Sequence, residues 1–200
     1  MSDSSNHIAD MRMATYETLL RKWQTRINLV ANSTLDDTRN RHFNDSLQIL
    51  PMIPAQARTL YDLGSGGGFP GLVLAIKRPD LSIHLIESNT KKTNFLQTVA
   101  RELELDNVSI HNTRIEEMTA ELPSPDVITA RALASLVNIF ELTAQWAKAN
   151  DNLRYILMKG RNAKQEICDA QKKFRFEHHT APSSTDPEAA ILRIQNVHKK

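Results

Sequence analysis

Residues 61–71 read YDLGSGGGFPG, and five of the six glycines in the chain lie between positions 64 and 71. The stretch follows a predicted strand at 59–63 and precedes a predicted helix that begins at Pro70. Glycines let the backbone turn sharply and approach a ligand closely, and the first turn of a helix offers free N–H groups. We therefore predict a ligand-binding loop at this strand-to-helix junction.

Two ligands suit this loop. Residues 66–71 match the GxGxxG fingerprint of dinucleotide-binding proteins, with Glu87 about twenty residues further on to hold a ribose. Residues 62–68 match the DxGxGxG loop of S-adenosylmethionine enzymes, in which Asp62 would lie near the ammonium of the methionine, directly or through water. The second interpretation is favoured because an acid before the first glycine is poorly placed beside a pyrophosphate. Glu87 suits both, since the ribose hydroxyls of either ligand need a carboxylate acceptor.

Strand and helix patterns alternate along the rest of the chain. The predicted strands are 59–63, 82–87, 107–111, 126–129 and 153–158, and the predicted helices are 70–77, 91–104, 135–148 and 162–174, with a short helical turn near Glu116. This alternation is typical of an α/β fold with a mostly parallel sheet covered on both faces. Two final strands, at 174–178 and 189–197, are separated by a Pro, Ser and Thr loop, which predicts an antiparallel hairpin at one edge.

The N-terminal part has a different pattern. Apolar residues recur every three or four positions over 8–30, and a second helical segment extends over about 36–50, where prolines stop it. We therefore expect a helical N-terminal cap at residues 1–54 and a Rossmann-like domain at 55–200.

Composition narrows the class of protein. The chain has 200 residues, of which 40% are hydrophobic and 24% charged, and this excludes collagen-like, disordered and disulfide-rich proteins. The single cysteine, Cys168, has no partner for an internal disulfide. The first residues lack a secretory signal pattern, and the apolar runs are far shorter than the roughly 18 residues of a membrane span. We expect a cytoplasmic protein that does not enter a membrane.

Charge is unevenly distributed, although the formal net charge is only +2. Residues 12–42 hold six Lys and Arg against three acids, residues 148–175 hold eight against three, and residues 43–147 hold eight against twelve. Two basic flanks around an acidic centre suit a protein that binds a polyanion with its edges. Solvated surface helices also carry such charges, so the pattern alone does not decide the partner.

Further segments give the chain a specific resemblance. Beside the glycine loop they are NLV at 28–30, RHFNDSL at 41–47, TRIEE at 113–117, ARALAS at 130–135 and MKG at 158–160. With them the chain resembles the bacterial 16S ribosomal RNA guanine-N7 methyltransferase G family, also called glucose-inhibited division protein B, over about residues 15–175. The resemblance implies the Rossmann-like fold of class I S-adenosylmethionine-dependent methyltransferases with a helical N-terminal cap.

The resemblance also implies a reaction and its partners. The reaction is transfer of a methyl group from S-adenosyl-L-methionine, which becomes S-adenosyl-L-homocysteine, to N7 of a single guanosine in 16S rRNA. The expected partner is 16S rRNA or the small ribosomal subunit, with no obligate protein partner.

The cofactor site can be assigned to positions of this sequence. The family's contacts fall on Gly64, Phe69, Ile115, Glu116 and Arg131, and the loop itself adds Asp62, Gly66, Gly68 and Glu87. A backbone N–H near Ile115 would meet an adenine ring nitrogen, and the Glu116 carboxylate would accept from the exocyclic amine. An acid at the start of a helical turn is also favoured by the helix dipole, so Glu116 has a structural explanation as well. The loop has Ser65 and Gly67 where the family often has threonine and proline.

The chemistry sets limits on the catalytic residues. Guanine N7 has a free lone pair and loses no proton when it attacks a methyl group, so we expect no general base. We also expect no metal, because no histidine has a partner at zinc-like spacing. Candidate RNA contacts lie on the cap and after the predicted strands, and they are Arg41, His42, Lys159 and Arg161.

Two alternatives stay open at the level of sequence. An NAD(P)-dependent oxidoreductase would use the same glycine loop for a dinucleotide. A non-enzymatic RNA-binding module on a methyltransferase fold would use the basic flanks without methyl transfer.

Overall fold

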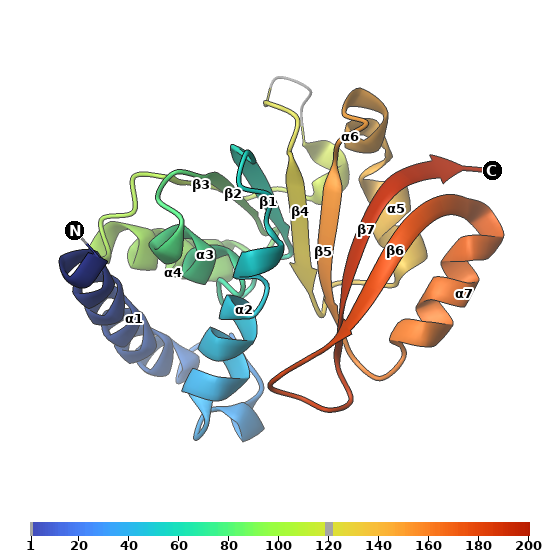
Figure 1. The fold of residues 1–200 in the computed structure, drawn as a ribbon. Helices are drawn as coiled ribbons and strands as arrows, with labels where there is room; N and C mark the ends of the chain where they lie inside the picture. Colours follow the sequence, from blue (N-terminus) through green and yellow to red (C-terminus); the bar gives the residue numbers. More distant parts are fainter. Residues whose placement is uncertain (1, 119–121) are drawn as a thin grey trace.

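The computed structural model describes residues 2–118 and 122–200. Its centre is a seven-stranded sheet in the order β3-β2-β1-β4-β5-β7-β6 (Figure 1). The strands are β1 Thr59–Leu63, β2 Ser82–Ile86, β3 Val108–His111, β4 Val127–Arg131, β5 Arg154–Lys159, β6 Phe174–Pro182 and β7 Ala190–Lys199. Strands β1 to β5 run parallel, and β7 pairs antiparallel with β5 and β6. The prediction of a mostly parallel sheet with a C-terminal antiparallel hairpin is confirmed.

Helices cover both faces of this sheet. They are α1 Ser2–Gln24, α2 Asp45–Leu47, α3 Gly71–Lys77, α4 Thr90–Glu102, α5 Leu136–Leu142, α6 Ala144–Ala149 and α7 Ala163–Lys173. Short helical turns are η1 Asn32–Thr34, the π-helical η2 Arg39–Asn44, η3 Leu50–Met52 and η4 Ile115–Glu117. Figure 1 shows α1, α3 and α4 on one side and α5, α6 and α7 on the other. Each side buries its own apolar cluster, and the cluster under α3 and α4 includes cap residues such as Tyr16 and Phe43.

Strand β1 is the point from which the sheet grows in both directions. All of its residues are buried, as is typical of a parallel strand covered on both faces. The chain adds β2 and β3 on one side of β1, then crosses back to add β4 and β5 on the other. Ligands bind such sheets beyond the carboxyl ends of the strands where the order reverses. Here the glycine loop follows β1, and Arg131 ends β4.

The cap contains less regular helix than its apolar spacing predicts. The helix predicted over 8–30 ends at Gln24, whose side-chain Oε1 accepts hydrogen bonds from the backbone N–H groups of Leu29 and Val30. The segment predicted as a helix over 36–50 is divided into η2, α2 and η3. Side-chain hydrogen bonding to the backbone thus replaces a further turn of helix and leaves Leu29 and Val30 beside the glycine loop.

The helix predicted over 135–148 is also divided, at Thr143, into α5 and α6. The buried Thr143 hydroxyl hydrogen-bonds with the carbonyl oxygen of Ile139 at 2.7 Å and with the Tyr155 hydroxyl at 2.9 Å. A threonine that bonds to the carbonyl four residues earlier bends a helix. The break follows from a contact with β5 that apolar spacing does not reveal.

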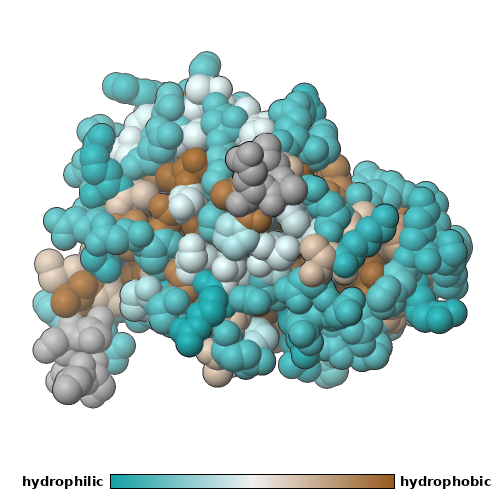
Figure 2. Space-filling model, turned by 90° about the horizontal axis from the view of Figure 1, so that it is seen from above, coloured by the Kyte–Doolittle hydropathy of each residue, from teal (hydrophilic) through white to brown (hydrophobic). Residues whose placement is uncertain are grey.

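The surface seen from above is largely hydrophilic, with apolar atoms in small separate patches (Figure 2). Within the part of the chain that the structure describes, no helix has both the length and the apolar character needed to span a bilayer.

Gly71, the first residue of α3, provides a test of this packing. A Cβ atom at Gly71 would collide with the Leu85 side chain and lie 2.8 Å from Asp62 Oδ2, whereas one at Gly160 would meet nothing within 4 Å. Overpacking of this kind costs about 1–3 kcal/mol of unfolding free energy. We expect Gly71→Ala to be destabilised by this amount in urea unfolding and Gly160→Ala to match the wild type. Equal stability of the two variants would contradict the packing described.

Candidate functional site

The glycine loop ends β1 and starts α3 through left-handed backbone conformations. Gly64, Gly66 and Gly68 have φ angles of 63°, 54° and 88°, a region that residues with side chains rarely adopt. The N–H of Gly64 donates to the carbonyl oxygen of Ile86 at 2.8 Å, which ties the start of the loop to the end of β2. Position 68 requires glycine for a second reason, because a Cβ atom there would lie 2.5 Å from the Tyr16 hydroxyl of the cap.

Asp62 supports the loop from inside the protein. Its side chain is fully buried, with Oδ1 accepting from the Thr129 hydroxyl at 2.8 Å and Oδ2 from the Gly71 N–H at 3.3 Å. Burial raises the pKa of Asp62 to about 6, and the hydrogen bonds from Thr129, Ser65 and Gly71 oppose this shift. Asp62 therefore fixes the strand end and the first residue of α3, and it does not line the cavities beside the loop.

Two cavities lie beside the loop at the carboxyl ends of the strands. The larger has a volume of about 720 Å³ and extends between the cap, the end of β4 and the β6–β7 loop. The smaller has a volume of about 400 Å³ and extends from the loop to η4. Residues of the glycine loop, α4 and the segment after β4 line both, and they are Gly64, Lys92, Ala132 and Leu133.

The smaller cavity combines apolar walls with two carboxylates. Ile115, Leu133 and Leu142 provide apolar surface, and Glu87 and Glu116 provide the acids. The largely buried Glu87 carboxylate accepts from the Gly66 N–H at 2.9 Å and from the Asn89 N–H at 2.8 Å. The side chain at the end of β2 is thereby held against the loop, with acceptor capacity left on both oxygens.

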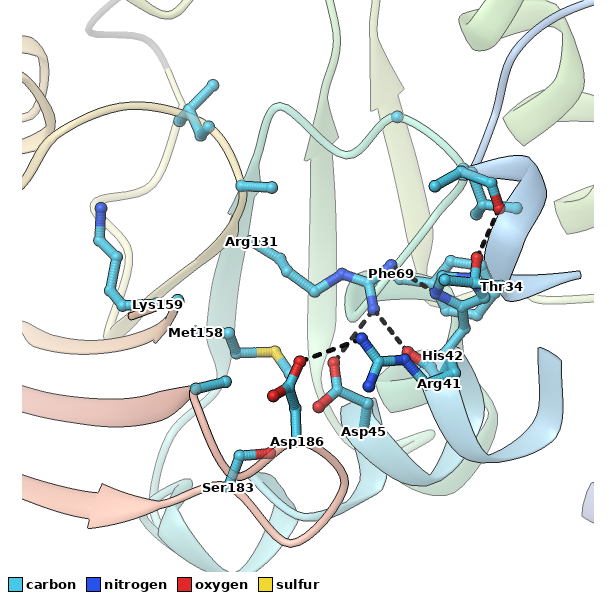
Figure 3. Close-up of a pocket in the computed structure, with 18 of the residues that line it drawn as sticks. Thr34, Arg41, His42, Asp45, Phe69, Arg131, Met158, Lys159, Ser183 and Asp186 are labelled. Atoms are coloured by element: carbon cyan, nitrogen blue, oxygen red, sulfur yellow. Dashed lines mark hydrogen bonds and ion pairs between the residues drawn. The ribbon is translucent and has the colours of Figure 1, made fainter. Parts of the chain in front are cut away.

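Arg131 occupies the centre of the larger cavity (Figure 3). Its Nη1 donates to Asp45 Oδ2 at 3.1 Å and to the carbonyl oxygen of Arg41 at 3.3 Å, and its Nη2 lies 3.0 Å from His42 Nδ1. Its Cζ atom lies 5.1 Å from the centre of the Phe69 ring. A residue of the sheet thus contacts both the cap and the glycine loop.

Phe69 in turn joins the glycine loop to the cap. Its ring stacks on Tyr16 and on His42, each with a centroid distance of 5.1 Å, and meets Phe43 edge-on at 5.3 Å. The Tyr16 hydroxyl also donates a hydrogen bond to the carbonyl oxygen of Gly67. The side chain of Phe69 is therefore nearly covered, although its residue still forms part of the cavity wall.

His42 is held as a neutral hydrogen-bond acceptor. A guanidinium has only donors, so Nδ1 of His42 accepts from Arg131 and the ring proton lies on Nε2. Nε2 then donates to the Thr34 hydroxyl at 2.8 Å, and this hydroxyl donates to the carbonyl oxygen of Ala31 at 2.7 Å. Burial lowers the pKa of His42 to about 4, with further lowering by the charges of Arg131 and Arg41.

The β6–β7 loop closes the larger cavity against the cap through polar contacts, which we call the clasp. Arg41 donates from Nη2 to Asp186 Oδ2 at 3.0 Å and from Nη1 to the Thr185 carbonyl oxygen at 3.3 Å. The Thr185 hydroxyl donates to Asp45 Oδ1 at 2.6 Å. Gln48 donates from Nε2 to Ser183 Oγ at 3.1 Å and accepts at Oε1 from the Ser184 N–H at 2.8 Å. Figure 3 shows Asp186 and Asp45 side by side between the two elements. The C-terminal hairpin, which the sequence left without a role, is therefore a wall of the site.

Lys159 has a partner on the protein. It is buried at the end of β5, 2.8 Å from Glu166 Oε2, and it donates to the carbonyl oxygen of Ala134. Its side chain points away from the Arg131 cluster in Figure 3. Glu166 also accepts from the Leu136 N–H at 2.8 Å, so the pair fixes the segment that follows β4.

The structure brings most of the predicted site residues together. The larger cavity is lined by Gly64, Gly66, Phe69, Arg131, Arg41, His42 and Lys159, and the smaller by Gly64, Glu87, Ile115 and Glu116. The buried Asp62 and Gly68 and the exposed Arg161 line neither cavity.

Other residues of the site were not singled out from the sequence. They are Thr34, Asp45, Leu133, Glu166 and Asp186. Asp45 and Leu133 stand inside the quoted RHFNDSL and ARALAS segments, so a signal existed for them. The Pro, Ser and Thr loop around Asp186 carries none.

The chain is similar to known proteins in sequence and in fold. A family model described as rRNA small subunit methyltransferase G matches residues 10–191. The ribosomal RNA small subunit methyltransferase G of Rhodospirillum centenum is 44% identical over 186 residues, which cover 93% of this chain and 83% of that protein. The protein of the same name from Brucella ovis is 41% identical over 199 residues, with 98% and 91% covered.

A solved structure agrees with the fold. A SAM-dependent methyltransferase from Aquifex aeolicus aligns with a TM-score of 0.61 at 11% identity, over 90% of this chain and 97% of that chain. This likeness confirms the predicted class I methyltransferase fold.

The neutral His42 makes stability depend on pH. The unfolded chain binds a proton on this residue below about pH 6.5, whereas the folded protein does so only near pH 4, so the unfolding free energy decreases as pH falls through this window. His84, with a pKa lowered to about 4, acts in the same direction, and Asp62, with a raised pKa, acts in the opposite one.

We expect His42→Asn to lose stability at pH 7 and to depend less on pH. The difference in unfolding free energy between wild type and variant should shrink by about 2–3 kcal/mol from pH 6.5 to 4 in urea titrations. His179→Asn, at an exposed position on β6, is the control. Parallel curves for the wild type and His42→Asn would show that His42 is not held neutral.

Proposed function

This chain belongs to the rRNA small subunit methyltransferase G family, and from this premise we propose that it methylates N7 of a single guanosine in 16S rRNA. It is an S-adenosylmethionine-dependent methyltransferase of small-subunit rRNA. The nicotinamide oxidoreductase and the non-enzymatic RNA-binding module are therefore both excluded as its main activity. The observation that supports the proposal best is the pair of cavities that meet at Gly64, one suited to an adenosine and the other open to a base.

The residues of the smaller cavity suit the adenosine of S-adenosylmethionine. Glu87 offers carboxylate oxygens to the ribose hydroxyls, and Ile115 and Leu133 offer apolar walls to an adenine. Glu116 stands at the same wall as an acceptor for the exocyclic amine. A Cβ atom at Gly66 would meet nothing closer than the Gly64 carbonyl oxygen at 3.7 Å, so a ligand can approach the loop backbone there. When bound, S-adenosylmethionine supplies a methyl group on a positively charged sulfur.

The remaining cofactor assignments follow from position. Gly64 and Phe69 place the loop backbone along the larger cavity, and Arg131 lines the same cavity from the end of β4. The buried Asp62 and Gly68 would act on the cofactor through the shape of the loop, not by contact.

The larger cavity suits a reaction that removes no proton. Each acidic or imidazole side chain that lines it already accepts a hydrogen bond or ion pair from another described residue, and these are His42, Asp45, Glu166 and Asp186. Guanine N7 attacks with a free lone pair and needs no base. The enzyme's task is then to hold the nucleophile in line with the methyl carbon, and positioning of this kind accounts for about 7–11 kcal/mol at its ideal limit.

The four residues predicted to contact RNA fall into two groups. Arg41 is partly exposed at the larger cavity and Arg161 is exposed just after β5, so a phosphate can reach both side chains. His42 and Lys159 are buried and already bonded, so we assign them to the shape of the cavity.

The Glu87 assignment can be tested by cofactor affinity. We expect Glu87→Gln to bind S-adenosyl-L-homocysteine about 10- to 100-fold more weakly, because hydrogen bonds to a charged group contribute about 1.5–3 kcal/mol. Glu117→Gln, an exposed acid on η4 that lines neither cavity, is the matched control. Calorimetric titration gives both affinities, and a thermal melt shows whether each variant is folded. Unchanged affinity in a folded Glu87→Gln protein would refute the ribose assignment.

The substrate proposal needs a direct assay. The protein is incubated with methyl-labelled S-adenosylmethionine and small ribosomal subunits from a strain that lacks the modification, and the labelled nucleotide is mapped. We expect label on N7 of one guanosine, and none with Gly66→Arg, whose side chain would fill the larger cavity. Label on a pyrimidine or on protein would overturn the proposal.

A further inference from the structure

The clasp is held by polar contacts and carries little apolar surface. Residues 183–189 read SSTDPEA, and the contacts that they make with the cap are hydrogen bonds and one ion pair. Contacts between solvated polar groups exchange readily with water or with another polar ligand. The β6–β7 loop can therefore leave the cap without exposing an apolar core.

Within the clasp, the ion pair between Arg41 and Asp186 is the contact that another ligand can replace most easily. The side chains of Arg41 and Asp186 are 37% and 32% exposed, and both line the larger cavity. Arg131 is different, because it is 20% exposed and is bonded to Asp45, His42 and a backbone carbonyl as well as covered by Phe69. Of these two arginines, Arg131 is fixed in place and Arg41 is free to change its partner.

A guanosine in the larger cavity brings its phosphates to this place. The base is one part of an RNA chain, so its ribose and flanking phosphates must remain at the mouth, between the cap and the β6–β7 loop. An arginine fork binds a carboxylate and a phosphate with the same geometry. Asp186 presents one carboxylate oxygen to Arg41 in the position where such a phosphate oxygen would bind.

We propose that the Asp186 carboxylate occupies the position on Arg41 at which an RNA backbone phosphate binds. The phosphate of the substrate replaces the carboxylate when the β6–β7 loop moves away from the cap. This inference rests on the proposed function, because it takes the larger cavity as the site of the target guanosine. Asp186 is then a competitor of the substrate, and the C-terminal hairpin regulates entry of RNA.

The test compares two charge-neutralising substitutions in the same loop. Asp186→Asn weakens the contact to Arg41 but keeps an acceptor for the Glu188 N–H, which Asp186 Oδ1 binds at 3.0 Å. Glu188→Gln removes the same charge from an exposed side chain that makes no contact with Arg41 among the described residues. Affinity for unmethylated small subunits is measured without methyl donor, and KM is measured with it.

We expect Asp186→Asn to bind subunits about twofold to fivefold more tightly than Glu188→Gln, since an exposed ion pair changes an equilibrium by little more than this factor. KM for subunits should fall by the same factor, with the affinity for S-adenosyl-L-homocysteine unchanged. Arg41→Gln should weaken subunit binding. It should also reduce the slope of log affinity against log salt concentration by about one phosphate contact. In the Arg41→Gln background, Asp186→Asn should bring no gain beyond that of Glu188→Gln.

Each other result counts against the inference. If Asp186→Asn and Glu188→Gln change the affinity for subunits equally, the change is a general effect of charge and the inference is wrong. Weaker subunit binding by Asp186→Asn, in a protein with an unchanged melting temperature, would show that the clasp helps to bind RNA. The subunit-binding measurement needs no methyl transfer, so a failure of the proposed reaction in the mapping assay is distinguishable from a failure here.

Discussion

The guanidinium of Arg131 joins the three parts of the site. It extends from the last residue of β4, lies over Phe69 of the glycine loop, and bonds to Asp45, His42 and the Arg41 carbonyl of the cap. The ion pair with Asp45 is mostly buried, and removing one partner of such a pair leaves an uncompensated charge that costs about 3–5 kcal/mol. Its charge adds to the lowering of the His42 pKa that burial causes, and its hydrogen bonds connect the cap to the sheet. The basic residue at the end of β4 is therefore a structural centre as well as part of the wall of the larger cavity.

Much of this arrangement could be predicted from the sequence because it rests on local patterns. The glycine loop, the strand before it and the helix after it share one short stretch, and Glu87 and Glu116 follow neighbouring strands of the sheet. The sequence places Asp62 at the end of the first strand but does not show its contacts, which are with Thr129 and the Gly71 N–H inside the protein. Apolar spacing could not show where α1 ends or where Thr143 divides a helix, since both depend on side chains that bond to backbone or to a distant strand.

The polar contacts that complete the site connect residues far apart in the chain. Lys159 pairs with Glu166 across a strand-to-helix turn, whereas Asp186 meets Arg41 over 145 positions. No composition or spacing rule links such a pair, and the β6–β7 loop has the residues of any solvated turn. Lys159 illustrates the same limit, because the sequence shows a cation at the end of a strand and does not show the carboxylate that pairs with it.

The hydrogen bond from Tyr16 to the Gly67 carbonyl oxygen has a consequence for the architecture of the chain. The N-terminal helix supports the backbone of the glycine loop from one side, and a shortened protein that begins near β1 would lose this support. Replacement of the cap by another module would therefore alter the shape of the loop and of the cavity that the cap lines. The helical cap and the loop that follows β1 are thus mechanically one unit in this protein.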